Sequence, residues 1–187
     1  MGKILVVIDM QNDFIDGALA NPDGQAIVES MAEFIHNWDG PVYYTMDTHF
    51  EDYLSTREGK YLPIPHCIYC THGFLINDTI NKALEEKNAK VFKKITFGSK
   101  YLAEYLFQMN TLAPCEGEPD EIYFCGLCTD ICVVANIVLV KTLLPEANIY
   151  MIENLCAGTT KEKHNATIEV LKSLQVEIVK AENGEVK

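Results

Sequence analysis

The sequence predicts an α/β fold in three α/β/α layers, built on a doubly wound, six-stranded parallel sheet. Short β-rich runs alternate with segments of helical periodicity along the chain. Several of these runs are apolar on both faces, which is typical of parallel strands that helices cover on both sides. With 187 residues, of which 48% are hydrophobic and 22% charged, the chain is expected to form a single domain over residues 1–187.

Six short runs are predicted to be strands because they concentrate β-branched, aliphatic or aromatic residues. They cover residues 3–8, 42–46, 89–93, 121–125, 149–152 and 176–179. Five segments with apolar residues three or four positions apart are predicted to be helices. They cover residues 25–38, 77–86, 100–109, 130–144 and 161–174. The fourth helix follows Thr129 and Asp130, either of which can serve as its N-cap.

The composition argues against several classes of function. The formal net charge of -12 leaves no basic surface for phosphates, so nucleic-acid binding is not expected. No apolar stretch is long enough to span a membrane, and the apolar run near the N-terminus is too short for a signal peptide. Seven cysteines, an odd number in a chain without an export signal, indicate free thiols in a cytoplasmic protein. The acidic stretch 113–120 is expected to be a surface loop.

Four chemically reactive side chains follow the ends of predicted strands. Asp9, Asp47 and Lys94 come directly after the first three strands, and Cys132 follows the fourth through a tight glycine turn. Because parallel sheets place their sites at the carboxyl ends of the strands, these side chains are expected to lie together. A carboxylate can accept a thiol proton and an ammonium group can stabilise the thiolate, so Asp9 and Lys94 are predicted to assist Cys132 as a nucleophile. Its place in the first turn of a helix is expected to lower the pKa of the Cys132 thiol.

Each of these residues also has a simpler interpretation. Most free cysteines are small buried hydrophobes, and Cys132 taken alone would be counted among them. Lys94 could be a solvated lysine like its neighbour Lys93, and Asp9 could do no more than open a loop. A charge at the end of a strand that is buried on both faces is costly unless it is paired, which favours the paired arrangement.

Three segments of the chain carry a more specific pattern. They are Asp-Met-Gln-Asn-Asp-Phe at residues 9–14, Lys-Ile-Thr-Phe-Gly-Ser at residues 94–99 and Gly-Leu-Cys-Thr-Asp-Ile-Cys-Val at residues 126–133. In this combination and order they resemble the signature segments of the isochorismatase-like cysteine hydrolases, the family that includes the nicotinamidases. The resemblance implies a six-stranded parallel sheet and a catalytic triad of Asp9, Lys94 and Cys132.

The resemblance also implies the details of the site and the reaction. The bond between Leu127 and Cys128 is expected to be cis, with the backbone N–H groups of Cys128 and Cys132 forming an oxyanion hole. The implied reaction is hydrolysis of a small carboxamide, with nicotinamide as the leading substrate, through a thioester on Cys132. Another small amide or carbamoyl compound is the alternative within the family. A homo-oligomer without an organic cofactor is expected.

Two other classes of function fit the sequence less well. A true isochorismatase hydrolyses a vinyl ether without a cysteine nucleophile, so a cysteine at position 132 argues against that activity. A non-catalytic binding or redox module would account for seven thiols. Such a module has no reason to keep Asp9, Lys94 and Cys132 at one edge of a sheet.

A second group of residues indicates a divalent-metal site. Asp47 and His49 are two positions apart, a spacing that projects both side chains to the same side of an extended chain. Carboxylate and imidazole ligands suit zinc, manganese or iron. In the nicotinamidases that the chain resembles, the corresponding Asp, His and His hold a metal that binds the pyridine nitrogen, which gives these roles to Asp47, His49 and His66. By spacing, Glu58 is the best candidate for a variable fourth ligand, ahead of Ser55.

A rival set of metal ligands lies in the segment 66–72, where Cys67 and Cys70 form a C-x-x-C flanked by histidines. A single C-x-x-C without a second pair is weak evidence for zinc. These two thiols are therefore expected to pack within a loop.

The residues that contact the substrate are less clear from the sequence. Phe14 and Leu19 follow the first acidic residue, Asp9. Phe97 and Tyr101 follow Lys94. Each could form a wall around a flat aromatic ring, and each could equally belong to the core. The stretch before His66 lacks a tryptophan that some nicotinamidases have there, so the pyridine-stacking part of the pocket is not predicted.

Overall fold

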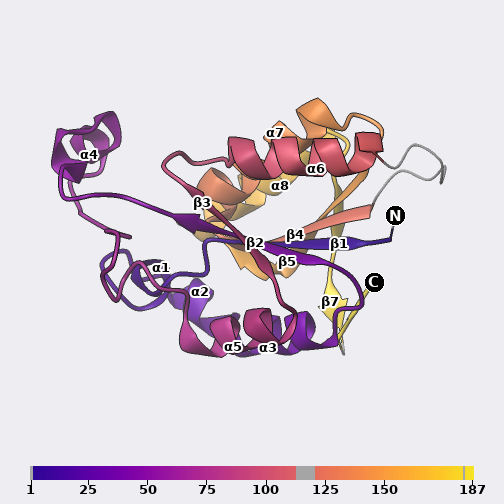
Figure 1. Cartoon of the computed structure of the whole chain (residues 1–187), viewed down its shortest axis with the longest axis horizontal. Coiled ribbons are helices and arrows are strands. Elements are labelled where there is room, and N and C mark those ends of the chain that lie inside the picture. The colour runs from indigo at the N-terminus through magenta and orange to yellow at the C-terminus, as the bar shows by residue number, and fades with distance from the viewer. Residues whose placement is uncertain (1, 113–120, 183) are drawn as a thin grey trace.

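Six parallel strands form the central sheet of the protein (Figure 1). The computed structural model describes residues 2–112, 121–182 and 184–187, so the predicted acidic loop at 113–120, with Cys115, lies outside the described residues. The strand order is β3-β2-β1-β4-β5-β6, and every neighbouring pair is parallel. The strands are β1 (Ile4–Ile8), β2 (Val42–Asp47), β3 (Lys90–Lys94), β4 (Glu121–Leu127), β5 (Asn148–Ala157) and β6 (Glu177–Val179). The predicted doubly wound parallel sheet is confirmed.

Helices cover both faces of this sheet (Figure 1). One face carries α3 (Val28–Asn37) and α5 (Asp78–Glu86), and the other carries α6 (Lys100–Leu112), α7 (Val134–Leu143) and α8 (Lys161–Ser173). The predicted helices at 77–86, 100–109 and 161–174 agree with α5, α6 and α8 to within the usual uncertainty of helix ends. Within the described residues, no helix has the length and apolar character needed to cross a membrane.

The helix predicted at residues 25–38 is wrong in its extent, because two helices occupy this region. The first, α2 (Pro22–Ala26), starts after Asn21, whose side-chain oxygen accepts hydrogen bonds from two backbone N–H groups of the first turn. Proline at the first helical position favours this early start. The chain then turns at Ile27, and α3 begins at the next residue.

Several short elements were not predicted at all. They are α1 (Asn12–Ile15), η1 (Tyr53–Ser55) and α4 (Arg57–Tyr61). Elements of this length contain too few residues to show a helical period in the sequence. The ribbon shows α4 standing away from the main body, at the end of the long connection between β2 and α5 (Figure 1).

β4 and β5 extend further than predicted toward the carboxyl edge of the sheet. β4 continues to Leu127 and β5 to Ala157, and the pairing between them shifts its register between Phe124 and Gly126. Such an irregularity bends the strand and breaks the alternation of side chains that sequence patterns depend on. The sequence therefore indicated only the regular first half of β5.

A small antiparallel hairpin, β7 (Ala181–Glu182) and β8 (Glu185–Val186), follows β6. The exposed side chain of Asn154, in the irregular part of β5, holds it in place. The Asn154 Nδ2 donates a hydrogen bond of 2.8 Å to the Ala181 carbonyl, and the Asn154 Oδ1 accepts one of 2.8 Å from the Ala181 N–H. Both of these hydrogen bonds of Asn154 are made with the hairpin and neither is made with the residues at the carboxyl edge of β1 to β4.

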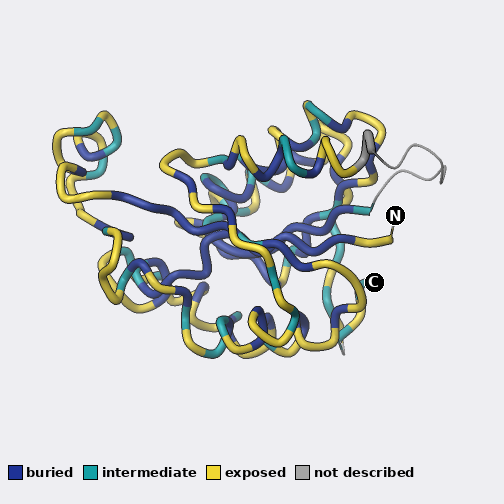
Figure 2. The backbone as a smooth tube through the Cα atoms, viewed as in Figure 1, coloured by how far each residue is buried: buried dark blue, intermediate teal, exposed yellow. Residues whose placement is uncertain are grey.

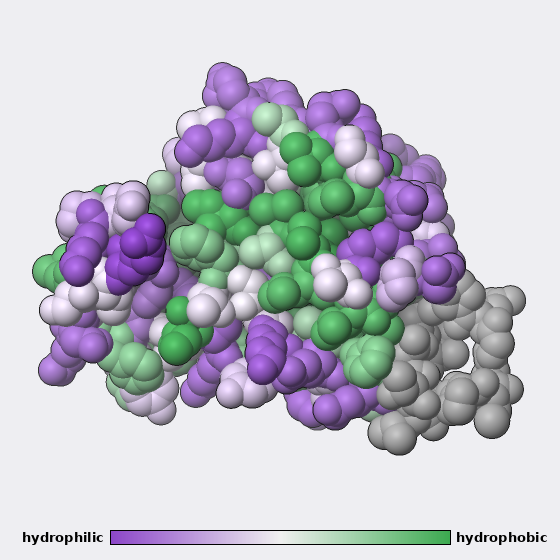
Figure 3. All heavy atoms as spheres, turned by 90° about the horizontal axis from the view of Figure 1, so that it is seen from above, coloured by the Kyte–Doolittle hydropathy of each residue, from purple (hydrophilic) through white to green (hydrophobic). Residues whose placement is uncertain are grey.

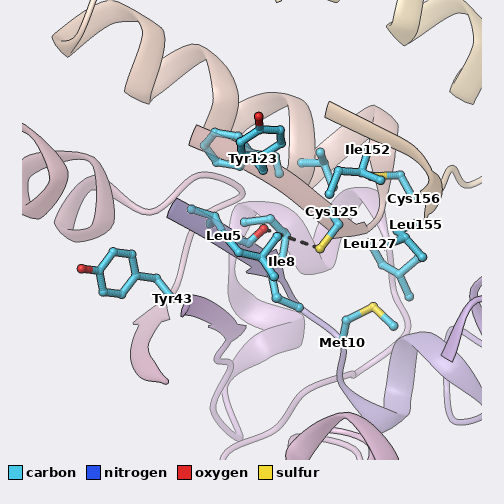
Figure 4. Packing of buried hydrophobic residues seen from close by; sticks show 14 of the residues in the cluster. Leu5, Ile8, Met10, Tyr43, Tyr123, Cys125, Leu127, Ile152, Leu155 and Cys156 are labelled. Atoms are coloured by element: carbon cyan, nitrogen blue, oxygen red, sulfur yellow. Dashed lines mark hydrogen bonds between the residues drawn. The ribbon is translucent and has the colours of Figure 1, made fainter. Parts of the chain in front are cut away.

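The core is centred on β1 and β4, which are buried along almost their whole length (Figure 2). Side chains of β1, β4 and β5 pack together there, and the Cys125 thiol donates to the Val6 carbonyl at 3.8 Å (Figure 4). Close packing of this kind gives the strand ends well-defined positions. The loops at the carboxyl edge are therefore attached to the most tightly packed part of the molecule.

The central pair β1 and β4 is also the switch point of the topology. After β1 the chain continues to the helices on one face of the sheet, and after β4 it continues to α7 on the other face (Figure 1). In open α/β sheets, a crevice outside the carboxyl ends of the strands forms where the connections diverge in this way. The functional site is expected in this crevice.

Candidate active site

Three ionisable side chains meet at the carboxyl edge of the sheet, although they come from distant parts of the sequence. Asp9 follows β1, Lys94 ends β3, and Cys132 lies in the turn after β4. The Lys94 Nζ is 2.6 Å from the Asp9 Oδ2 and 3.6 Å from the Cys132 Sγ. All three residues are buried. The structure thus brings together the three residues that the sequence predicts as a triad.

Asp9 is held by its backbone and by a hydroxyl group. Its φ of 48° lies in the left-handed region, which short polar residues such as Asp adopt more readily than most others. The Thr45 hydroxyl donates a hydrogen bond of 2.6 Å to the Asp9 Oδ1. Burial raises the pKa of the Asp9 carboxyl, while Lys94 and Thr45 act in the opposite direction.

Lys94 owes its orientation to strand pairing. Asp47 and Lys94 are directly paired residues of the parallel strands β2 and β3, so their side chains point to the same face. The Lys94 Nζ lies 3.4 Å from the Asp47 Oδ1. Burial alone would lower the pKa of Lys94, but Asp9, Cys132 and Asp47 together raise it. Lys93 points the other way and is exposed, so the solvated-lysine interpretation applies to Lys93 and not to Lys94.

The turn that carries Cys132 differs from the predicted helix start. It is a π-helical turn, η2 (Thr129–Val133), which precedes α7, and its N-cap is Cys128 without a side-chain capping bond. The predicted capping role of Thr129 or Asp130 is therefore wrong. The Thr129 hydroxyl is instead 2.8 Å from the His164 Nδ1 of α8. The Asp130 carboxylate accepts two hydrogen bonds from Thr159, at 2.7 and 2.6 Å.

The pKa of the Cys132 thiol shifts in the direction opposite to the prediction. Burial raises it well above the ordinary value for cysteine; Lys94 lowers it, and the carboxylates of Asp9 and Asp47 raise it further. The beginning of a helix lowers the pKa of a thiol, but here this effect is smaller than that of full burial beside two carboxylates. These surroundings favour the protonated form of the Cys132 thiol, and the Asp9 carboxyl is a hydrogen-bond partner of this thiol.

The peptide bond between Leu127 and Cys128 is cis, as the family resemblance implied. Burial raises the pKa of the Cys128 thiol to about 12. What distinguishes the two thiols is the contact of the Lys94 ammonium group, which is made with the Cys132 sulfur. The role of the Cys128 and Cys132 backbone N–H groups as an oxyanion hole stays a prediction.

Four side chains of metal-ligand type converge next to this triad. They are Asp47, His49, Glu58 and His66, and one ligand atom from each lies within 4.8 Å of all the others. The Asp47 Oδ2 is 3.0 Å from the His49 Nε2 and 3.6 Å from the His66 Nε2. The Glu58 Oε1 is 3.7 Å from the His49 Nε2 and 3.8 Å from the His66 Nε2.

The long connection between β2 and α5 folds so that these four residues meet. His49 pairs with Ile68 in a parallel bridge, and its backbone N–H donates to the Cys67 carbonyl at 3.0 Å. This pairing brings His66 beside His49. Glu58 comes from α4, which Thr56 caps through a 3.0 Å hydrogen bond from the Gly59 N–H.

The aromatic ring of Tyr53 fills the space behind the two imidazoles and was not predicted as part of the site. Its centroid is 4.7 Å from that of His49 and 5.1 Å from that of His66. The Gly59 position lies so close to the Tyr53 carbonyl that a Cβ there would be only 2.2 Å from the oxygen. A glycine is therefore needed for α4 to pack onto this turn.

The chemistry of the four residues fits a divalent metal. A tetrahedral metal with ligand bonds of about 2.1 Å separates its ligand atoms by about 3.4 Å, close to the spacings described above. The His66 Nδ1 is bonded to the Ile64 carbonyl at 2.9 Å, which directs the other ring nitrogen toward the cluster. Burial and the nearby Asp47 raise the pKa of Glu58, so a bound cation would relieve the repulsion between two close carboxylates.

The rival ligand set is not assembled in the described part of the chain. Cys67 is buried and its backbone N–H donates to the Asp13 Oδ2 at 2.7 Å, whereas Cys70 is exposed. Both thiols are free, and neither belongs to the converging cluster. The expected packing within the loop is confirmed for Cys67 and is wrong for Cys70, whose side chain is exposed.

The four predicted substrate contacts have different surroundings. Phe14 is buried with its ring centroid 5.5 Å from that of His66, and Leu19 packs against the core. Phe97 and Tyr101 are 49% and 71% exposed. None of the ring contacts or hydrogen bonds among the described residues joins Tyr101 to the triad. The role of all four in substrate binding stays a prediction.

Two buried polar residues that sequence reasoning missed connect the parts of the site. The Gln11 side chain donates to the Asp47 carbonyl at 2.8 Å and accepts from the Asp47 N–H at 2.7 Å. The Asn136 side chain bonds to the Cys132 carbonyl and to the loop after Lys94. Gln11 lies within the first signature segment, which was a usable signal, whereas nothing in the sequence distinguished Asn136.

Comparison with known proteins finds similarity over nearly the whole chain. The isochorismatase domain family matches residues 3–183. The nicotinamidase of Saccharomyces cerevisiae is 23% identical over 222 residues, covering 95% of this chain and 99% of the relative. Two crystal structures each have a TM-score of 0.75. The pyrazinamidase of Pyrococcus horikoshii in complex with zinc is 25% identical over 96% of this chain and 99% of that one. The nicotinamidase PncA of Bacillus subtilis is 26% identical over 95% and 99%.

Proposed function

This chain belongs to the isochorismatase family, and from that premise we propose that it is a cysteine-dependent amidohydrolase in which Cys132 attacks a small carboxamide. The observation that carries the proposal is the contact of one buried lysine with both a buried carboxylate and a buried thiol, at 2.6 Å from the Asp9 Oδ2 and 3.6 Å from the Cys132 Sγ. A cysteine that serves only to fill the core needs neither partner. The similarity to nicotinamidases and pyrazinamidases supports the same class of reaction.

In the first half of the proposed reaction, Asp9 accepts the proton of the Cys132 thiol while the sulfur attacks the carboxamide carbon. Burial raises the pKa of both groups and Lys94 lowers both, so the proton can pass between them without leaving an unpaired charge. The backbone N–H groups of Cys128 and Cys132 would stabilise the oxyanion. Asp9 then donates its proton to the nitrogen, the C–N bond breaks, and ammonia leaves a thioester on Cys132.

In the second half, a water molecule attacks the thioester carbon. Asp9 accepts a proton from this water, and the C–S bond breaks to release the carboxylic acid. The proton on Asp9 returns to the sulfur, which restores the starting state. Lys94 stays charged throughout, because its neighbours Asp9 and Asp47 raise its pKa despite its burial.

We propose that Asp47, His49, Glu58 and His66 hold a divalent metal beside the triad. Zinc, manganese and iron can all take more than four ligands, so a metal held by these four residues would supply a further coordination position to a donor atom of the substrate, for example a ring nitrogen. The Asp47 Oδ1 lies 3.4 Å from the Lys94 Nζ, while its other oxygen is turned toward the two histidines. A substrate held at the cluster would therefore lie close to the thiol.

Nicotinamide is the proposed substrate, and another small amide or carbamoyl compound is the alternative. Support for nicotinamide comes from the full-length similarity to nicotinamidases together with the ligand cluster next to the triad. A panel of amides tested with metal-loaded and metal-free protein separates the two. Ammonia release from nicotinamide that is lost in Asp47→Ala or His49→Ala supports the proposed substrate. Robust turnover of an aliphatic carbamoyl compound by metal-free protein, without turnover of nicotinamide, would support the alternative.

The nucleophile is tested with Cys132→Ser. We expect ammonia release to fall by about three orders of magnitude or more, because the serine hydroxyl is a much weaker nucleophile in the same place. Thermal unfolding should be nearly unchanged, since the two side chains are close in size. Cys70→Ser, at an exposed cysteine, is the matched control and should keep full activity. Turnover by Cys132→Ser close to that of the wild type would rule out the proposed mechanism.

A further inference from the structure

Lys94 and Cys132 are in contact although the strands that carry them are not neighbours. β3 is at the edge of the sheet, and β2 and β1 separate it from β4. Strand pairing therefore fixes Lys94 relative to Asp47 but does not directly fix it relative to Cys132. A contact between the segments that follow β3 and β4 can therefore help to set the 3.6 Å distance between the Lys94 Nζ and the Cys132 Sγ, beside the ion pair of Lys94 with Asp9.

The side chain of Asn136 makes such a contact. It is completely buried on α7, one helical turn after Cys132. Its Nδ2 donates hydrogen bonds to the Cys132 carbonyl at 2.7 Å and to the Phe97 carbonyl at 3.2 Å. Its Oδ1 accepts a hydrogen bond of 2.8 Å from the Ser99 N–H. One amide group thus joins the turn of the thiol to the middle and the last residue of the loop 95–99 that follows Lys94.

A glycine in the same loop provides a second, independent observation. A Cβ at Gly98 would lie 2.6 Å from the Leu139 Cδ1 and 3.0 Å from the Ala135 carbonyl oxygen. The loop therefore packs with its backbone directly against α7, and a larger residue would push it away. The loop is also joined to α6, because the Ser99 Oγ accepts a hydrogen bond of 3.2 Å from the Leu102 N–H.

We propose that Asn136 is a positioning residue, which holds the loop 95–99 against the turn of Cys132 and so sets the distance between Lys94 and the thiol. This inference rests on the proposed function, because it concerns the alignment of the same triad. None of the hydrogen bonds among the described residues joins the Asn136 side chain to the thiol or to the Lys94 ammonium group. Its effect is transmitted through the backbone on both sides of the contact.

Two substitutions on opposite sides of this contact test the proposal. In Asn136→Thr the hydroxyl can still bond to the carbonyl four residues earlier, that of Cys132, but it is too short to reach the loop. In Gly98→Ala the asparagine stays and the loop is displaced. For both variants we expect kcat for ammonia release to fall about ten- to a hundredfold, with KM within about twofold of the wild type. The double variant should lose little more than the more severe single variant, because both act on one contact.

Asn154→Ala is the matched control, since Asn154 also fastens a backbone segment with two hydrogen bonds but does so at the hairpin β7–β8. It should lower the unfolding temperature while kcat stays within about twofold of the wild type. Activities are compared at a temperature where all variants are folded by circular dichroism. Wild-type kcat in both Asn136→Thr and Gly98→Ala, or an effect on KM alone, would overturn the proposal.

A crystal structure of Asn136→Thr gives a readout that does not depend on turnover. We expect the distance between the Lys94 Nζ and the Cys132 Sγ to increase beyond the 3.6 Å of the native arrangement. An unchanged distance would overturn the positioning role even if activity fell. If the wild type hydrolyses no small carboxamide, the proposed function fails, and this distance still decides whether Asn136 sets the geometry.

Discussion

The proton transfers of the proposed reaction depend on Asp9, and the pKa of its carboxyl group follows from its burial and from two close neighbours. The Lys94 ammonium group and the Thr45 hydroxyl stabilise its ionised form, whereas the buried surroundings favour the protonated form. Burial outweighs the other two, so the pKa of Asp9 is raised. A carboxyl group with a raised pKa is a stronger base once ionised, which suits the transfer of protons to and from sulfur, nitrogen and water.

Replacing Thr45 by valine should therefore change the pH dependence of the reaction. The hydroxyl lowers the pKa of Asp9, so its removal raises that pKa further. Asp9 must be ionised to accept a proton, and the acidic limb of the kcat/KM profile should move to higher pH. The apparent pKa belongs to Asp9 and Cys132 as a coupled pair. Thr142→Val, which removes an exposed hydroxyl on α7, should leave the profile in place. A limb that does not move in Thr45→Val would contradict the role given to this hydroxyl.

Among the helices and strands, the regular elements were predictable and the functional turns were not. The strands that lead to Asp9 and Asp47 are runs of mostly apolar, aromatic or β-branched residues, and Val91 and Phe92 mark the strand that ends at Lys94. The positions of these strands could therefore be found in the sequence to within one residue at each end. The turn around Cys132 could not, because the side chains of Thr129 and Asp130 bond to α8 and to the segment before it instead of capping their own helix. Tertiary contacts of this kind leave no periodic signal.

The four proposed metal ligands show the same division. Asp47 and His49 were predicted from spacing in an extended segment, and His66 and Glu58 from the family resemblance and position. Nothing in the sequence indicated α4 or the pairing of His49 with Ile68, which together make the four side chains meet. Neither did it indicate the raised pKa of Cys132, which depends on complete burial beside two carboxylates.

Zinc should stabilise the protein through the connection between β2 and α5. At a zinc concentration about 100 times the Kd, binding to the folded state alone adds about 2.7 kcal/mol, which is a rise in Tm of roughly 5 to 10 °C for a domain of this size. His66→Ala should abolish most of this rise. Cys70→Ser and His72→Ala, which remove members of the rival ligand set, should retain it. Differential scanning fluorimetry with and without a chelator measures the effect, and loss of the rise in the Cys70 or His72 variants would instead favour the rival set.

For the molecule as a whole, the most unusual surface lies over α6 and α7. The space-filling view of this side shows hydrophobic side chains gathered around the middle of the face (Figure 3). α7 is apolar almost all the way around, and a helix of that kind is normally covered on every side. Its Val138 and Leu139 are nevertheless 39% and 36% exposed.

We therefore expect the protein to form a homo-oligomer that covers this face of α7. Val138→Glu together with Leu139→Lys should shift the molar mass measured by light scattering toward that of the single chain, 21.0 kDa. Leu75→Glu is the control, because Leu75 is also an exposed apolar residue, at 51%, but lies in the segment that leads to α5, on the other side of the sheet. A wild-type protein with the mass of one chain at micromolar concentration would contradict the prediction.

The separate origins of the triad and the ligand cluster have a consequence for how such a protein can change. Asp9, Lys94 and Cys132 come from three strand ends, whereas His49, Glu58 and His66 all come from the single connection between β2 and α5. The hydrogen bond from Lys94 to Asp47, at 3.4 Å, joins the two groups. The part that we propose to select the substrate is thus encoded, apart from Asp47, by one contiguous stretch of the gene, and we expect this stretch to be exchangeable as a unit. We expect that grafting another connection between β2 and α5 would change the substrate preference and leave Asp9, Lys94 and Cys132 in place.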